Sequence, residues 1–153
     1  MMNDSAKQLI ETLKAQGKTL ATAESCTGGG IGHVITAVSG SSAVYLGGVI
    51  SYANSVKEQV LGVPYNVLDT VGAVSEETAR AMVAGVCRLT GADVGIAVTG
   101  IAGPNSDGTD KPVGLVYIAV SKDGVVTVTE NHFSGDREAV RNQTIEMAVR
   151  MAM

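Results

Sequence analysis

The sequence predicts a single three-layer α/β/α domain over residues 1–153, with a mixed sheet that includes one antiparallel hairpin. Short apolar runs alternate with amphipathic segments, an order typical of strands that lie between layers of helices. Lys122-Asp123-Gly124 separates two β-rich runs, and Asp-Gly in this position is a strong hairpin signal. Only 3% of the residues are aromatic and Trp is absent, so we expect a core of aliphatic side chains in closely packed layers.

The first half of the chain predicts three helices and two strands. Leu9 and Leu13 recur at helical spacing, and the glycines after Thr27 lead into a second pattern of this kind. Gly62 and Pro64 end a short third helix. The predicted helices are 5–16, 27–38 and 54–61, and the predicted strands are 19–23 and 44–52.

The second half predicts two long helices, a central strand and the hairpin. Ser75 is a natural N-cap, and Glu76 and Glu77 complement the positive end of the helix that follows. Alternating Val and Ile before Gly100 indicate the central strand. The predicted helices are 75–89 and 137–153, the strands are 93–99, 113–121 and 125–133, and a Gly- and Pro-rich loop covers 100–112.

Charge and cysteine content narrow the class of protein. The net charge is −4 and no run of Lys or Arg occurs, so we expect no nucleic-acid binding. No apolar run reaches the length of a membrane span and no signal-peptide pattern is present, so neither membrane nor export is expected. Two cysteines in such a chain predict reduced thiols in a cytoplasm. His33 and His132 have no ligand-spaced Cys or His beside them, so no metal site is expected.

Three predicted strands are followed by loops rich in glycine or polar residues, at 24–30, 52–57 and 99–112. Ligands of open α/β sheets bind at the carboxyl ends of strands, so these loops predict one composite site. Neither G-x-G-x-x-G nor a P-loop is present in the chain, which excludes the two common phosphate-binding loops.

The first loop places Ser25 where a strand turns into a helix. Gly28 and Gly29 allow close backbone approach, and N–H groups at a helix start can hold an oxyanion or a phosphate. The pattern suits a serine nucleophile, and it equally suits a helix cap followed by a flexible turn. Cys26 is the rival nucleophile, because a helix N-terminus lowers the pKa of a thiol. Without a suitable histidine, a buried structural Cys26 is the favoured interpretation.

A serine nucleophile needs a base. His33 lies near the far end of its own predicted helix, and His132 is expected to be an exposed strand residue. Lysine can serve instead when burial or neighbouring groups lower its pKa. Lys57 in the second loop is therefore the candidate base, with Tyr52 relaying or orienting the proton. As a lone residue, Lys57 would be solvated.

The third loop and the last helix offer groups for binding. Thr99 presents a hydroxyl and Gly100 an open N–H, although this segment is also consistent with a plain connecting loop. Arg137 and Arg141 are four residues apart and face the same way on a helix. They suit either a clamp for an anionic group or ordinary exposed charges.

Seven stretches follow one another in the chain: Thr22-Ala23-Glu24-Ser25-Cys26-Thr27-Gly28-Gly29, Gly40-Ser41-Ser42, Leu46-Gly47-Gly48, Gly72-Ala73-Val74-Ser75-Glu76-Glu77-Thr78-Ala79, Val98-Thr99-Gly100-Ile101-Ala102-Gly103-Pro104, Lys111-Pro112-Val113-Gly114-Leu115-Val116-Tyr117-Ile118 and Gly135-Asp136-Arg137. Together they resemble the successive blocks of the CinA C-terminal domain, from about Leu20 to Arg141. The large N-terminal domain of longer members is absent, so the chain resembles the stand-alone form. Asn142 stands near Gln143 where many members carry a second arginine.

The resemblance implies an amidase that converts nicotinamide mononucleotide and water into nicotinic acid mononucleotide and ammonia, without a cofactor. It implies Ser25 as the nucleophile and places the family's Tyr and Lys on Tyr52 and Lys57. We expect N–H groups around Thr27 and Gly28 to hold the tetrahedral oxygen. We expect the substrate to contact Thr27, Gly28, Gly29, Ser42, Thr99, Gly100 and Arg141.

Two other functions fit the same sequence. The glycine loops would serve a non-catalytic module that senses a pyridine nucleotide or a related phosphate, with no activated serine. The family name also suggests an interaction protein in a competence or DNA-damage pathway, although no basic patch supports direct DNA contact. The expected partners are a small nucleotide and further copies of the chain in a homo-oligomer.

Overall fold

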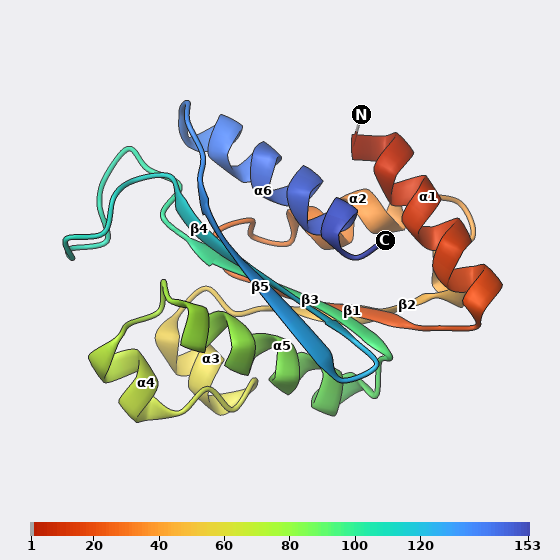
Figure 1. Ribbon diagram of the computed structural model, residues 1–153, viewed down its shortest axis with the longest axis horizontal. Helices are drawn as coiled ribbons and strands as arrows, with labels where there is room; N and C mark the ends of the chain where they lie inside the picture. Colours follow the sequence, from red (N-terminus) through yellow and green to blue (C-terminus); the bar gives the residue numbers. More distant parts are fainter. Residues whose placement is uncertain (1) are drawn as a thin grey trace.

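The computed structural model describes residues 2–153, in which a five-stranded sheet separates two layers of helices (Figure 1). One face of the sheet is covered by α1 (Met2–Gln16), α2 (Gly30–Thr36) and α6 (Arg137–Met151). On the other face lie α3 (Asn54–Gln59), α4 (Tyr65–Thr70) and α5 (Glu76–Thr90). The predicted α/β/α architecture is confirmed.

The sheet has the strand order β2-β1-β3-β4-β5 and mixes parallel and antiparallel pairs. Its strands are β1 (Leu20–Glu24), β2 (Tyr45–Ile50), β3 (Val94–Gly100), β4 (Leu115–Lys122) and β5 (Val125–His132). β1 runs parallel to β2 and β3, whereas β4 is antiparallel to β3 and β5. Asp123 and Gly124 take φ values of 51° and 86° between β4 and β5. Positive φ at both central residues is what a type I′ hairpin turn requires, so the predicted hairpin is confirmed.

The two faces of the sheet carry different side chains. Leu20, Ile96 and Ile118 pack with α1, α2 and α6 in one apolar cluster. On the opposite face Ala23 lies beside Ala97, which lies beside Ala119. These small side chains make a flat strip on which α5 packs closely, and both layers exclude water from the central strands.

Two helices show the clearest differences from the predicted elements. α4 was not predicted, because it has only 6 residues, too few for a clear helical period, although Val67 and Leu68 pack partly buried against the core. The second helix begins at Gly30 rather than at Thr27, since Gly28 and Gly29 take φ values of 59° and 96°, which a right-handed helix cannot contain.

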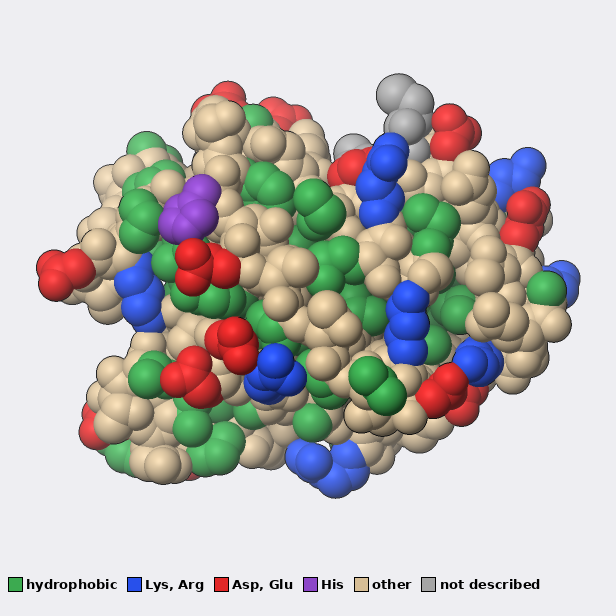
Figure 2. Space-filling model, viewed as in Figure 1, with side chains coloured by type: hydrophobic (Ala, Val, Ile, Leu, Met, Phe, Trp, Pro, Cys, Tyr) green, Lys and Arg blue, Asp and Glu red, His purple; other side chains and the backbone are tan. Residues whose placement is uncertain are grey.

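The surface charges and the helix lengths can be compared with the expectation of no nucleic-acid and no membrane partner. Basic and acidic side chains are interspersed over the described residues of the face in Figure 2, without a continuous basic area. Within residues 2–153, no helix is both long and apolar enough to cross a membrane.

Candidate active site

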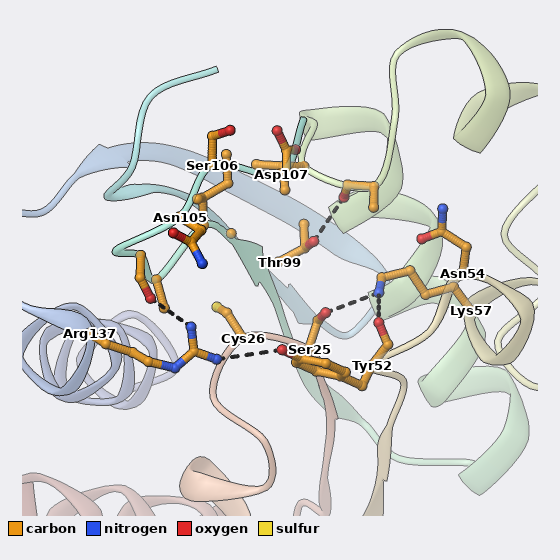
Figure 3. Close-up of a pocket in the computed structure, with 16 residues that line it drawn as sticks. Ser25, Cys26, Tyr52, Asn54, Lys57, Thr99, Asn105, Ser106, Asp107 and Arg137 are labelled. Carbon is orange, nitrogen blue, oxygen red and sulfur yellow. Dashed lines mark hydrogen bonds between the residues drawn. The ribbon is translucent and has the colours of Figure 1, made fainter. Parts of the chain in front are cut away.

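The loops that follow β1, β2 and β3 surround a cavity of about 320 Å³ (Figure 3). Because the three strands are parallel, their carboxyl ends meet at one edge of the sheet. Ser25 reaches this cavity from the end of β1, Tyr52 and Lys57 from the segment after β2, and Thr99 and Gly100 from the end of β3.

Lys57 is in direct contact with Ser25. Its Nζ lies 3.0 Å from Ser25 Oγ, 2.7 Å from the carbonyl oxygen of Ser51 and 3.1 Å from that of Tyr52 (Figure 3). A neutral amine has two N–H donors and one lone pair. With the two carbonyls accepting the N–H groups, the lone pair faces the Ser25 hydroxyl and can accept its proton.

The environment of Lys57 increases the fraction of this neutral form. The side chain is 1% exposed, and none of the ion pairs formed within residues 2–153 includes it. Burial lowers the pKa of Lys57 from 10.5 to about 8. The short helix α3 creates this burial, because it packs the lysine against the carboxyl ends of β1 and β2. Near neutral pH a usable fraction of the amine is therefore unprotonated.

The first turn of α2 is closed to anions. The Gly30 N–H donates to the Thr27 carbonyl at 3.0 Å, and the Ile31 and Gly32 N–H groups donate to the Glu24 carboxylate at 2.8 and 2.9 Å. These donors, which the sequence left free for an oxyanion or a phosphate, are already used. The Gly28 N–H also donates, to the Ser25 carbonyl at 3.1 Å.

Cys26 lines the same cavity as Ser25, but its thiol is not activated. Its side chain is only 6% exposed, and burial raises its pKa to about 12. The thiolate is the reactive form of cysteine, so a pKa this high leaves the thiol inert at neutral pH. The structural interpretation of Cys26 is thus the one that the geometry favours.

Tyr52 differs from the expected proton relay. Its backbone carbonyl contacts Lys57, but its side chain is 64% exposed and its hydroxyl lies 3.5 Å from Arg137 Nη2 (Figure 3). The reason is the direction of the backbone after β2, which turns the carbonyl inward and the ring toward α6. Tyr52 therefore orients the amine through its main chain.

Arg137 and Arg141 contact different carbonyl groups. Arg137 lines the cavity, and its Nη1 donates to the Gly103 carbonyl at 2.7 Å. Arg141 Nη2 donates to the Thr27 carbonyl at 3.0 Å in the loop after β1. Arg141 borders a separate hollow, which Arg137, Asp136 and Glu138 also line. Arg137 therefore borders both spaces, whereas Arg141 does not line the cavity.

Of the other predicted residues, Thr99 and Gly100 line the cavity and Ser42 does not. Thr99 is 1% exposed and its hydroxyl donates to the Ala73 carbonyl at 2.8 Å, which holds one wall of the cavity. Gly100 lines the cavity, and a Cβ there would meet the Leu115 carbonyl at 2.8 Å. Ser42 is exposed in the 3-10 turn before β2, at the opposite edge of the sheet, and does not line the cavity.

Sequence reasoning missed several residues of the cavity wall. Asn54 follows β2, and Asn105 and Asp107 stand on the long loop after β3. The wall at Ala73 and Val74 comes from the connection between α4 and α5. A signal existed for the loop, since long loops in small domains are often functional, but none existed for the alanine and valine.

Comparisons with known proteins identify the family to which this fold belongs. The family model described as the CinA C-terminal domain matches residues 2–153. The chain belongs to the CinA C-terminal domain family. A relative from Enterobacter agglomerans, named nicotinamide-nucleotide amidohydrolase PncC, is 42% identical over 99% of this chain and 93% of its own.

Other CinA relatives are longer or have known structures. A CinA-like protein from Synechococcus sp. (strain RCC307) is 49% identical over 86% of this chain and 31% of its own, so the chain spans about a third of such relatives. A CinA superfamily protein from Klebsiella pneumoniae 700603 has a crystal structure with a TM-score of 0.97 and 34% identity, covering 99% of this chain and 95% of its own. For a competence/damage-inducible protein from Agrobacterium tumefaciens the TM-score is 0.94 at 39% identity, covering 98% and 92%.

Proposed function

We propose that this CinA domain hydrolyses the carboxamide of nicotinamide mononucleotide to give nicotinic acid mononucleotide and ammonia. The observation that carries the proposal is the 3.0 Å contact between Ser25 Oγ and the buried Nζ of Lys57. A hydroxyl next to an amine of lowered pKa is the arrangement of an activated nucleophile. The relative of nearly equal length that is named for this reaction supports the choice of substrate.

The reaction has two halves. Ser25 attacks the carboxamide carbon while Lys57 accepts its proton, which gives a tetrahedral intermediate. The resulting ammonium of Lys57 is held by the two carbonyls and gives a proton to the departing ammonia. Water then attacks the ester on Ser25, with Lys57 again as base, and the acid is released.

The cavity supplies contacts for the rest of the substrate. Ile101 and Val74 offer an apolar wall for the pyridine ring. We assign the phosphate to Arg137, because Arg137 lines the cavity and Arg141 does not. Arg141 then acts on the Thr27 carbonyl rather than on substrate, and Ser42 has no contact in this proposal.

The rate should follow the protonation of Lys57. Since the neutral amine is the base and burial lowers its pKa to about 8, kcat/KM is expected to rise about tenfold per pH unit below pH 8 and to level off above it. Steady-state rates between pH 5.5 and 9.5 measure this profile. A rate that falls from pH 6 to pH 8 would contradict a lysine base.

Arg137→Met is expected to raise KM for nicotinamide mononucleotide about 10- to 100-fold with little change in kcat, since a charge-assisted contact to the phosphate is lost. The unphosphorylated riboside serves as the control substrate, and its kcat/KM should hardly change. An equal decrease in kcat/KM for the two substrates would show that Arg137 does not bind the phosphate.

Ammonia release from the purified protein tests the function itself. A panel of carboxamides is assayed, with nicotinamide mononucleotide first, and this compound should give the highest kcat/KM. Tight binding of nicotinamide mononucleotide without ammonia release would instead indicate the non-catalytic sensor. The expected homo-oligomer stays a prediction, which sedimentation of the same sample tests.

A further inference from the structure

The Glu24 carboxylate lies directly before the nucleophile in the chain and is 2% exposed. Oε1 accepts hydrogen bonds from Thr27 Oγ1 at 2.6 Å and the Ile31 N–H at 2.8 Å. Oε2 accepts from the Gly32 N–H at 2.9 Å and from Thr22 Oγ1 at 3.3 Å. Among the ion pairs of residues 2–153, none involves Glu24. Neutral donors alone compensate this buried carboxylate, so its position depends on all of them.

The main chain of Glu24 contacts the other half of the site. Its carbonyl oxygen accepts from the Ser51 N–H at 2.7 Å and from Ser51 Oγ at 3.3 Å. The Ser51 carbonyl in turn accepts from Lys57 Nζ. One residue therefore joins the loop of the nucleophile to the segment that orients the base.

The nucleophile loop needs such a restraint. Gly28 and Gly29 both take positive φ, and glycine loses more conformational freedom on ordering than any other residue. The Glu24 carboxylate reaches across this loop, because it holds Thr27 before the glycines and the first turn of α2 after them. One carboxylate thus fixes the chain on both sides of the two glycines.

We propose that Glu24 is a positioning residue, whose buried carboxylate fixes the nucleophile loop so that Ser25 Oγ meets Lys57 Nζ. The expected effect on kcat rests on the proposed function. The predicted position of Ser25 Oγ beside Lys57 Nζ does not depend on which substrate the protein uses. A mere helix cap would contribute to stability alone. A positioning group also sets the reactivity of Ser25.

Glu24→Gln keeps the size of the side chain but replaces one carboxylate oxygen by an amide nitrogen, which cannot accept a hydrogen bond. The donor that faced this oxygen then faces the N–H groups of the amide. The probe is a fluorophosphonate, which reacts with activated serines and needs no recognition of nicotinamide mononucleotide. Its rate of attachment to Ser25 is expected to fall at least about tenfold, since small misplacements of reacting groups carry costs of this order. For nicotinamide mononucleotide, kcat should fall in step while KM changes less than about threefold.

Thr27→Val provides a second and milder variant, which removes only the contact to Oε1. It should slow attachment in the same direction, and Glu24→Gln with Thr27→Val should lose less than the product of the two single losses, because both break one link. Thr144→Val is the matched control, since it removes a buried hydroxyl that contacts the Val140 carbonyl in α6. Its attachment rate should equal that of the parent protein, whatever its loss in thermal stability.

Thermal unfolding shows whether each variant is folded. If Glu24→Gln does not fold, the attachment rate of Thr27→Val is used in its place. Attachment rates within twofold of the parent in folded Glu24→Gln or, in its absence, Thr27→Val would overturn the proposal. So would a crystal structure of that variant with Ser25 Oγ still 3.0 Å from Lys57 Nζ. A parent protein that reacts with the fluorophosphonate but hydrolyses no carboxamide would refute the proposed function and leave the role of Glu24 standing.

Discussion

Ser25→Ala is expected to lower kcat for nicotinamide mononucleotide about 10⁴-fold or more, with little change in KM, because the variant loses the atom that forms the acyl-enzyme. The side chain is small and lies at the cavity wall, so its loss leaves the apolar core intact. Ammonia release and equilibrium binding of substrate measure the two effects separately.

Cys26→Ala is the control for this result. Its thiol neighbours Ser25 in the same cavity, but burial raises its pKa to about 12. The variant should keep kcat within a few-fold of the parent protein. An active Ser25→Ala together with an inactive Cys26→Ala would show that the thiol is the nucleophile.

Lys57→Met is expected to lower kcat about 10³-fold, since general base catalysis by a positioned group contributes roughly 10²- to 10⁴-fold. Methionine has a similar length but carries no amine, so the Ser25 hydroxyl keeps its proton. The residual rate should also lose its rise with pH near 8, because the titrating group is gone. Rates at pH 6 and pH 9 are sufficient to detect this change.

Lys57→Arg is the informative control for charge. The guanidinium keeps a cation near the Ser51 and Tyr52 carbonyls but stays protonated, so it cannot act as a base. If the arginine variant is as inactive as the methionine variant, proton transfer is the function of Lys57. Recovery of most of the activity with arginine would indicate electrostatic stabilisation instead.

Most of the fold follows from local pattern. The apolar runs of β1 and β3 and the cap at Ser75 are visible in the sequence, and Ser75 does accept the Thr78 N–H in the structure. Asp123-Gly124 predicts the hairpin because few other residue pairs tolerate its backbone. α4 is the exception, because a helix of 6 residues is too short for its partly buried Val67 and Leu68 to show a period.

Less of the site follows from local pattern, because its contacts join distant segments. Ser25 and Lys57 are 32 residues apart, and only the packing of α3 against the sheet edge brings them together. The Tyr52 ring points toward Arg137 of α6, 85 residues away in the chain, and no local pattern indicates this contact. Glu24 is adjacent to Ser25 in the chain, yet its role depends on burial and on donors up to eight residues away.

Identifying the residue that carries the acyl group tests most directly whether Ser25 is the nucleophile. The protein is mixed with nicotinamide mononucleotide, quenched in acid during turnover and digested, and the peptides are analysed by mass spectrometry. We expect the nicotinoyl nucleotide as an ester on Ser25, with about one ammonia released per protein as this ester forms. The same acyl group on Cys26, as a thioester, would contradict a Ser25–Lys57 amidase.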